Sequence, residues 1–291
     1  MTWFFLTIIA VIFIVIETAL EKKTLIKARS LEFAAMFAFC NAIVLAPFIF
    51  VIDMSQLNIT ALGLIFLASI PSAGASLLVF KTIKHNQLSE AAPIIALLPL
   101  VVTLFAYLIL GEKITAIQIL GLFLIVGGMI FMELNNFRLN NGIFRKGRGK
   151  YIFYIFLYLI IGGISAMFDR VILFEYKTNA LSYLIFIQIF IAINYALFFL
   201  CKPRLIKELK INIQQSWKIV FLISILTVAH RYMYASAVQV AASMGLVVAV
   251  YKLSSLFNVF TGGKVFSEDS IFRKTLASIV ILGGTIMLVI K

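Results

Sequence analysis

Long apolar runs separated by short polar stretches dominate the pattern of this 291-residue chain. Within each run the apolar positions are continuous or follow a helical period, and they do not alternate as they would in a strand. A helix needs roughly 20 apolar residues to cross a bilayer. Ten runs approach that length: residues 2–19, 31–52, 60–81, 91–110, 116–132, 151–168, 180–201, 218–238, 243–263 and 271–290. The pattern therefore predicts an all-α polytopic membrane protein with ten transmembrane helices.

Composition supports a membrane protein and excludes several other classes. Apolar residues make up 63% of the chain and charged residues 13%, whereas soluble domains have about 45–50% and about 25%. One water-soluble core cannot hide that excess, which excludes soluble enzymes and nucleic-acid-binding modules. Cys40 and Cys201 lie in apolar runs, so we expect them to pack as small hydrophobic side chains rather than form a disulfide or bind a metal. The sequence indicates no cofactor.

The ten runs form two groups of five on either side of the longest polar connection. We expect a first five-helix repeat over residues 1–133, a basic connecting loop over 134–150 and a second repeat over 151–291. When the second half is shifted back by 156 residues, Glu112, Gly127 and Gly128 meet identical residues, namely Glu268, Gly283 and Gly284. Because each repeat has an odd number of spans, the second must be inverted. The prediction is two inverted five-helix repeats, with a site near the midplane between them.

A second correspondence joins the ends of the first and sixth spans. At a shift of 148, Glu21-Lys22 falls on Asp169-Arg170, and the small difference from 156 fits loop insertions. Asp169 and Arg170 stand at a span end, so they are expected to lie at the membrane interface.

Basic residues gather on alternate loops. Of the 25 Lys and Arg residues, 17 fall in the first, third, fifth, seventh and ninth connections, and four fall on the side that holds both termini. Cytoplasmic loops of membrane proteins are enriched in Lys and Arg. The expected location is therefore the bacterial cytoplasmic membrane, with both termini outside the cell. The basic excess orients the chain and does not indicate nucleic-acid binding.

Residues 91–132 read AAPIIALLPLVVTLFAYLILGEKITAIQILGLFLIVGGMIFM. This stretch resembles the end of an EamA-type repeat of the drug/metabolite transporter superfamily. The residues that carry the resemblance are Pro93, Pro99, Gly111-Glu112-Lys113, Gly121 and Gly127-Gly128. The second copy keeps Glu268 and Gly283-Gly284, and has Ser255, Ser267 and Ala277 in place of Pro99, Gly111 and Gly121.

The resemblance extends over the ten-span plan and implies a 5+5 inverted-repeat transporter with a central cavity. Members of the family move amino acids, other metabolites, nucleotide-linked sugars or drugs, and the motif does not select among these. Many members are expected to have cytoplasmic termini, whereas the charge count predicts the reverse here.

The motif residues have plain physical roles. The small residues are expected to let neighbouring helices approach closely; they are Gly127, Gly128, Gly283 and Gly284. Pro93 and Pro99 free backbone carbonyls and permit a kink in the fourth span, which either lines a cavity or serves packing. Glu112 and Glu268 stand at turns, and each is expected to begin the next helix with its carboxylate at the positive end of the helix dipole.

Four ionisable residues fall well inside predicted spans: Glu17, His230, Arg231 and Lys252. A charge near the bilayer centre costs about 2.5–3.5 kcal/mol on insertion scales, so such residues usually face a cavity or a partner. The turn between the eighth and ninth spans centres near residue 241, and Arg231 and Lys252 each lie roughly 15 Å from it at ~1.5 Å per residue. The two cations should therefore be level and near the midplane.

Polar residues accompany both cations. Thr227, Arg231 and Tyr234 share a helical stripe on the eighth span, and Lys252 and Ser255 share a face of the ninth. We predict that these five residues bind the substrate. Two level cations repel each other, and an anionic group would relieve that repulsion, since a guanidinium can bind a carboxylate or phosphate bidentately.

Glu17 admits two interpretations. It lies roughly 22 Å deep in the first span, where it could form an internal ion pair with Arg231 or act as a proton-coupling residue. His230 points about 100° away from Arg231 and is expected to be a hydrogen-bonded core residue.

The combined pattern predicts a secondary active transporter that moves a small organic metabolite, anionic or zwitterionic, by alternating access. Its expected partners are that substrate, the lipid bilayer and protons as candidate coupling ions. A flippase for a lipid-linked phosphate or sugar headgroup would use the same cations and is an alternative, as is a non-transporting membrane scaffold. The sequence holds no HExxH, GxSxG or P-loop pattern, so neither an enzyme nor direct ATP drive is expected. The pattern makes no prediction of oligomeric state.

Overall fold

The computed structural model describes residues 2–52, 58–95, 97–110, 115–138, 149–176, 178–201, 203–240, 244–268 and 270–289. Every regular element within these ranges is a helix. The α-helices are α1 (Thr2–Leu25), α2 (Ser30–Leu45), α3 (Ile59–His85), α4 (Leu88–Ile95), α5 (Leu98–Leu110), α6 (Ala116–Arg138), α7 (Gly149–Arg170), α8 (Ala180–Leu200), α9 (Pro203–Val240), α10 (Met244–Phe266) and α11 (Ile271–Val289). A 3₁₀ segment, Ala46–Phe50, prolongs α2, and a π-helical segment, Val171–Glu175, prolongs α7.

Each of the ten predicted spans corresponds to one helix or to two consecutive helices. The fourth span is divided, because α4 ends at Ile95 and α5 begins at Leu98. Pro99 is the second residue of α5, and a proline is tolerated in the first turn since its missing N–H would have no helical partner there. The predicted kink is thus a break between two helices. The other difference is α9, which begins at Pro203, well before the apolar run.

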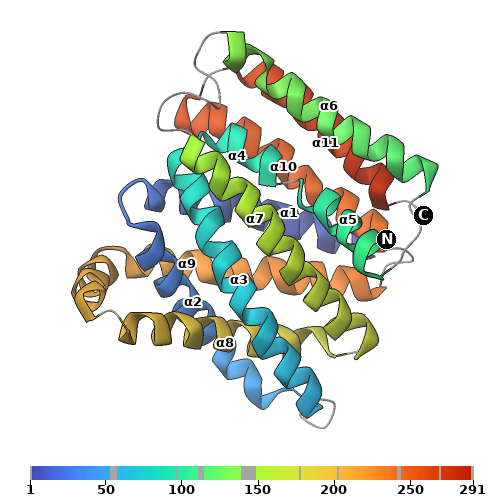
Figure 1. Cartoon of the computed structure of the whole chain (residues 1–291). Coiled ribbons are helices and arrows are strands. Elements are labelled where there is room, and N and C mark those ends of the chain that lie inside the picture. The colour runs from blue at the N-terminus through green and yellow to red at the C-terminus, as the bar shows by residue number, and fades with distance from the viewer. Residues whose placement is uncertain are drawn as a thin grey trace.

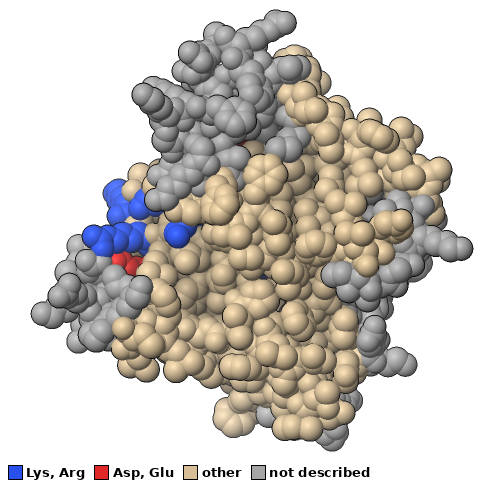
Figure 2. Space-filling model, in the orientation of Figure 1, with Lys and Arg blue, Asp and Glu red and all other residues tan. Residues whose placement is uncertain are grey.

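The surface of the bundle suits a bilayer. Five of the described helical segments are long and apolar enough to cross a membrane: Thr2–Leu25, Ser30–Phe50, Ile59–His85, Phe153–Leu173 and Ala180–Leu200. Large apolar side chains are exposed on the outside, including Phe5 at 62%, Phe123 at 72% and Phe156 at 53%. In Figure 2 the charged side chains gather at one edge, and the rest of the described surface in that view carries none. Exposed apolar area on this scale is stable against lipid rather than water.

The two halves make equivalent contacts with each other. At the shift found in the sequence, α7 is the counterpart of α1, α8 of α2, α9 of α3, α10 of α4 and α5, and α11 of α6. Helix α1 packs against α9 and α10, while α7 packs against the corresponding α3 and α5. Likewise α2 packs against α9 as α8 packs against α3. Two inverted repeats produce this exchange of partners. The repeat boundaries stay a prediction, and residues 139–148 of the connecting loop lie outside the described ranges.

The contact between α6 and α11 shows the register of the repeat (Figure 1). A Cβ atom added to Gly128 would lie 2.8 Å from Cγ1 of Ile281, and one added to Gly284 would lie 2.7 Å from Cγ1 of Ile125. Both glycines and both isoleucines are related by the shift of 156 residues. Each helix therefore places a glycine against an isoleucine of the other at equivalent positions. A larger residue in place of either glycine would clash with that isoleucine.

The first glycine of each pair does not take part in this crossing. A Cβ atom added to Gly127 or Gly283 would have no atom within 4 Å among the described residues. Consecutive residues of a helix point about 100° apart, so only one of two adjacent glycines can face the partner helix. The expectation of close packing is therefore wrong for Gly127 and Gly283.

Two apolar clusters flank the centre of the bundle. One joins α2, α3, α8 and α9 and includes Phe33 and Phe80, whose ring centroids are 4.9 Å apart. The other includes Ile125 of α6, Tyr158 of α7 and Ile281 of α11. Phe80 and Tyr158 also line a cavity, so the clusters support its walls.

The helix ends divide into two sides. Figure 1 shows α1 beginning and α11 ending at one side of the bundle. At the other side α1 meets α2, α3 meets α4 and α10 meets α11, and the cations Lys22, Lys84 and Lys274 bind polar atoms of these ends. We call this the basic side, because it is the side to which the loop charges assigned the cytoplasm.

Candidate functional site

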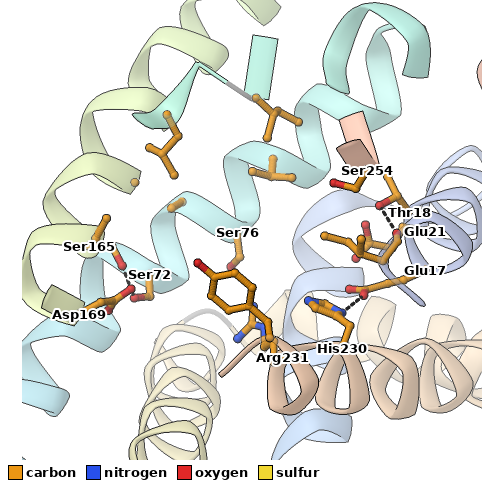
Figure 3. Close-up of a pocket in the computed structure, with 18 of the residues that line it drawn as sticks. Glu17, Thr18, Glu21, Ser72, Ser76, Ser165, Asp169, His230, Arg231 and Ser254 are labelled. Carbon is orange, nitrogen blue, oxygen red and sulfur yellow. Dashed lines mark hydrogen bonds and ion pairs between the residues drawn. The ribbon is translucent and has the colours of Figure 1, made fainter. Parts of the chain in front are cut away.

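A central cavity of about 820 Å³ is lined by residues of both halves. The first half contributes α1 to α4 and the start of α5, and the second contributes α7 to α10. The sequence predicted a site at this position, between the repeats. The close-up in Figure 3 shows part of its lining, with carboxylates, hydroxyls and a guanidinium facing a common space.

Both predicted cations line this cavity. Arg231 of α9 and Lys252 of α10 are half-buried, and neither makes a hydrogen bond or ion pair with another residue in the described part of the chain. Removing a charge from water costs several kcal/mol unless a partner compensates it. Water or an anionic ligand in the cavity can supply the direct contact that both cations lack.

The other predicted contacts divide between the cavity and its wall. Tyr234 and Ser255 line the cavity, and the ring of Tyr234 lies 4.6 Å from that of Tyr251, centroid to centroid. Thr227 is not among the lining residues. It is buried, and its hydroxyl lies 2.8 Å from Oε1 of Glu17. Thr227 therefore lies behind the cavity wall and contacts the Glu17 carboxylate, which itself lines the cavity. This corrects the expected role of Thr227 as a direct substrate contact.

Glu17 is paired with His230 rather than with Arg231. Nδ1 of His230 lies 2.6 Å from Oε2 of Glu17, a contact that Figure 3 marks with a dashed line. Both side chains are buried. His230 thus faces a buried carboxylate at ion-pair distance, and it also lines the cavity. Its expected burial is confirmed, but its Nδ1 has no hydrogen-bond partner among the described residues.

Two further carboxylates line the cavity, and the sequence interpretation did not place them there. Glu21 lies one turn after Glu17 on α1. Asp169 of α7 accepts a hydrogen bond from the Tyr183 hydroxyl and faces the cavity instead of the membrane interface. The shift of 148 residues already pairs Glu21 with Asp169, so the repeat itself was the signal that could have found them.

The cavity therefore contains charges of both signs. Arg231 lies within electrostatic reach of Glu21 and Asp169. A ligand with an anionic group can approach Arg231 and Lys252, and a cationic group can approach the carboxylates. The described residues hold no group of three or more His, Cys, Asp or Glu side chains that could bind a metal ion.

The remaining motif residues lie away from the cavity charges. Pro93 is buried within α4, and residues 111–114, including Glu112, lie outside the described ranges. Glu268 does not begin α11, the helix that follows it. Its carboxylate accepts hydrogen bonds from the backbone N–H groups of Leu88 and Ser89 at the start of α4, in the other half. The Glu268 carboxylate does lie at the positive end of a helix dipole, as expected. The helix is α4, however, which is distant from Glu268 in the sequence.

Comparisons with known proteins agree with this architecture. Residues 1–134 match the model of the EamA-like transporter family. A solved structure described only as "Crystal structure of protein" has a TM-score of 0.63 and 15% sequence identity, covering 98% of this chain and 95% of that chain. At this identity the likeness shows the fold alone. No curated protein matches the chain.

Proposed function

We propose, because residues 1–134 match the model of the EamA-like transporter family, that the chain is a secondary active transporter for a small anionic or zwitterionic metabolite. The family is one of membrane transporters, not enzymes. The basic side faces the cytoplasm in this proposal, because cytoplasmic loops are enriched in Lys and Arg. Labelling of an N141C variant by an impermeant reagent from outside the cell would overturn this orientation.

The unpaired cations carry the proposal. Arg231 and Lys252 face the central cavity, and neither makes a hydrogen bond or ion pair with a described residue. A carboxylate or phosphate of the substrate would supply the missing charge, and Arg231 can bind it with two parallel hydrogen bonds. A stable internal ion pair would have satisfied these cations within the protein. Two cations that lack such an ion pair suit a ligand that binds in the cavity and is then released.

Proton coupling is proposed at Glu17 and His230. The pair lines the same cavity as Arg231, and its two facing atoms lie 2.6 Å apart, close enough for a proton to bridge them. Glu21 lies one turn away on α1. A proton bound at this pair changes the charge of the cavity, so that substrate and proton affect each other's binding.

Ligand binding to the purified protein tests the proposal. Organic acids, amino acids and their uncharged amides are added while thermal unfolding is recorded, because a ligand that binds only the folded state raises its stability by RT ln(1 + [L]/Kd). Stabilisation by compounds with an anionic group, and not by their amides, is expected. R231A and K252A should each lose it, whereas K264A removes an exposed lysine of α10 and should retain it.

The same measurement separates the alternatives. If R231A and K252A, shown to be folded, still bind the anions, the site is elsewhere. A phosphorylated lipid that stabilises the protein when no small acid does would favour the flippase. Reconstituted vesicles then determine whether a stabilising compound crosses the membrane, and binding without flux would favour a scaffold.

A further inference from the structure

Polar contacts tie several helix ends together at the basic side, beyond one end of the cavity. The connection between α3 and α4 lies at their centre, with α1 on one side and α10 and α11 on the other. The residues involved are Lys22, Gln87, Ser89, Glu90, Glu268 and Lys274. These six residues are called the basic-side cluster below.

Glu268 holds the first turn of α4 from the opposite half. Its Oε1 lies 2.6 Å from the N–H nitrogen of Leu88, and its Oε2 lies 2.8 Å from that of Ser89. The first N–H groups of a helix have no partner within the helix, and they favour a negative charge. A carboxylate that binds two of them forms strong, charge-assisted hydrogen bonds.

The segment that carries Glu268 is shaped for this contact. Ser267 and Ser270 have φ angles of 51° and 58°, which are unfavourable for residues other than glycine. A Cβ atom added to Gly262 would lie 3.0 Å from the Ser89 nitrogen and 3.1 Å from Cδ of Glu268. Backbone strain that persists in a structure marks a position fixed by its surroundings.

Two lysines complete the cluster, one from each half. Lys274 of α11 bonds to Oε1 of Gln87 and, at 2.9 Å, to the Ser89 hydroxyl, and its Nζ lies 3.3 Å from Glu90. Lys22 of α1 donates to the carbonyl oxygens of Ile83 at 2.6 Å and Asn86 at 2.5 Å. Both lysines are buried, at 5% and 8% exposure.

The cluster lies directly behind the end of the cavity. Leu88 and Ile83 both line the cavity, and both are buried, at 0% and 2% exposure. The backbone N–H of Leu88 is held by Glu268, and the carbonyl of Ile83 is held by Lys22. The side chains that close the cavity here are therefore fixed through their own main chain.

We propose that the basic-side cluster is a latch that keeps this end of the cavity closed and opens when substrate passes to the basic side. The proposal rests on the transporter assignment but not on the identity of the substrate. Its bonds suit a reversible closure, because they join polar groups at helix ends that water can satisfy once the ends separate, whereas an apolar seal offers no such exchange.

The helices of the latch also carry the charges of the cavity. Lys22 follows Glu21 directly on α1, and α10 carries Lys252 before it ends next to Glu268. A change of charge in the cavity that shifts α1 or α10 must therefore strain the bonds of Lys22 or Glu268. This arrangement gives a physical route from ligand or proton binding to release of the latch.

Cysteine labelling from the basic side tests the latch. In a C40A/C201A background, L88C places a thiol at the closed end of the cavity. The protein is reconstituted so that only its basic side meets an impermeant maleimide, without substrate or gradient. Labelling should be slow in this background and about tenfold or more faster in E268Q and K274Q, which lose charge-assisted bonds. K264Q, at an exposed lysine at the end of α10, should leave the rate unchanged.

The outcomes separate the latch from the transport proposal. Equal rates in the background, E268Q and K274Q would overturn the latch, as would an equal increase in K264Q. Each variant is checked by size exclusion and thermal unfolding, and if E268Q does not fold, K274Q and Q87A test the same contacts. Since the rate is measured without substrate, loss of anion binding would defeat the transport proposal while leaving this result valid.

Discussion

The basic-side cluster and the central cavity hold buried charges in two different ways. In the cluster, Lys22 and Lys274 each make two or more polar contacts within hydrogen-bond or ion-pair distance. In the cavity, Arg231 and Lys252 make none with the described residues. A cation with partners holds helices together, whereas a cation that lacks them stabilises nothing until a ligand arrives. In the proposed transporter the same kind of charge therefore serves structure at one level of the bundle and substrate binding at another.

Removing one cation from each region should have unequal effects on stability. K274A leaves the acceptors of Gln87 and Glu90 without their buried partner, and we expect a loss of about 3 kcal/mol. R231A removes a charge that makes no hydrogen bond or ion pair and only lies within electrostatic reach of Glu21 and Asp169, so it should cost less than K274A. Thermal unfolding of both variants in one detergent provides the measurement. If R231A is as destabilised as K274A, the contrast between the regions is false.

A methyl group at Gly262 should weaken the cluster without touching a charge. In G262A the new Cβ meets the Ser89 nitrogen and the Glu268 carboxylate, and overpacking of this kind costs about 1–3 kcal/mol. G283A is the matched control, since its Cβ would meet no described atom within 4 Å. Unfolding temperatures are compared for the two variants, and a decrease in G283A equal to that in G262A would contradict the close approach.

Glu17 is an exception among the charges of the cavity, because it lines the cavity and yet contacts a partner, His230. E17Q keeps the size of the side chain but cannot share a proton with His230 in the same way. If one proton moves with each substrate, a pH gradient supports at most about tenfold accumulation per pH unit, or ~1.4 kcal/mol. We expect E17Q vesicles to lose this gradient-driven accumulation and to keep substrate exchange at equal pH. Unchanged accumulation in E17Q would exclude Glu17 as the coupling site.

The sequence predicted the features that depend on local pattern. The spans follow from runs of apolar residues, and Arg231 and Lys252 could be placed from helical spacing and distance to one turn. Both are arguments along a single helix or between chain neighbours. Both residues line the central cavity, and their common depth stays a prediction that rests on the bilayer fixing the depth and direction of each helix.

The sequence did not predict features that depend on partners distant along the chain. Glu268 binds the start of α4, Thr227 lies against Glu17, and Glu17 meets His230. In each case the residue type and its depth fit several partners, and only the packing of the helices selects one. Asp169 was misplaced because the end of an apolar run was taken as the membrane interface, although α7 continues into Val171–Glu175.

The crossing of α6 and α11 has a consequence for the origin of the chain. Gly128 meets Ile281 as Gly284 meets Ile125, with equivalent residues on both sides. A self-complementary interface of this kind is the signature of a symmetric homodimer. A single five-helix unit, inserted into the membrane in both orientations, could therefore form the same crossing with a second copy of itself.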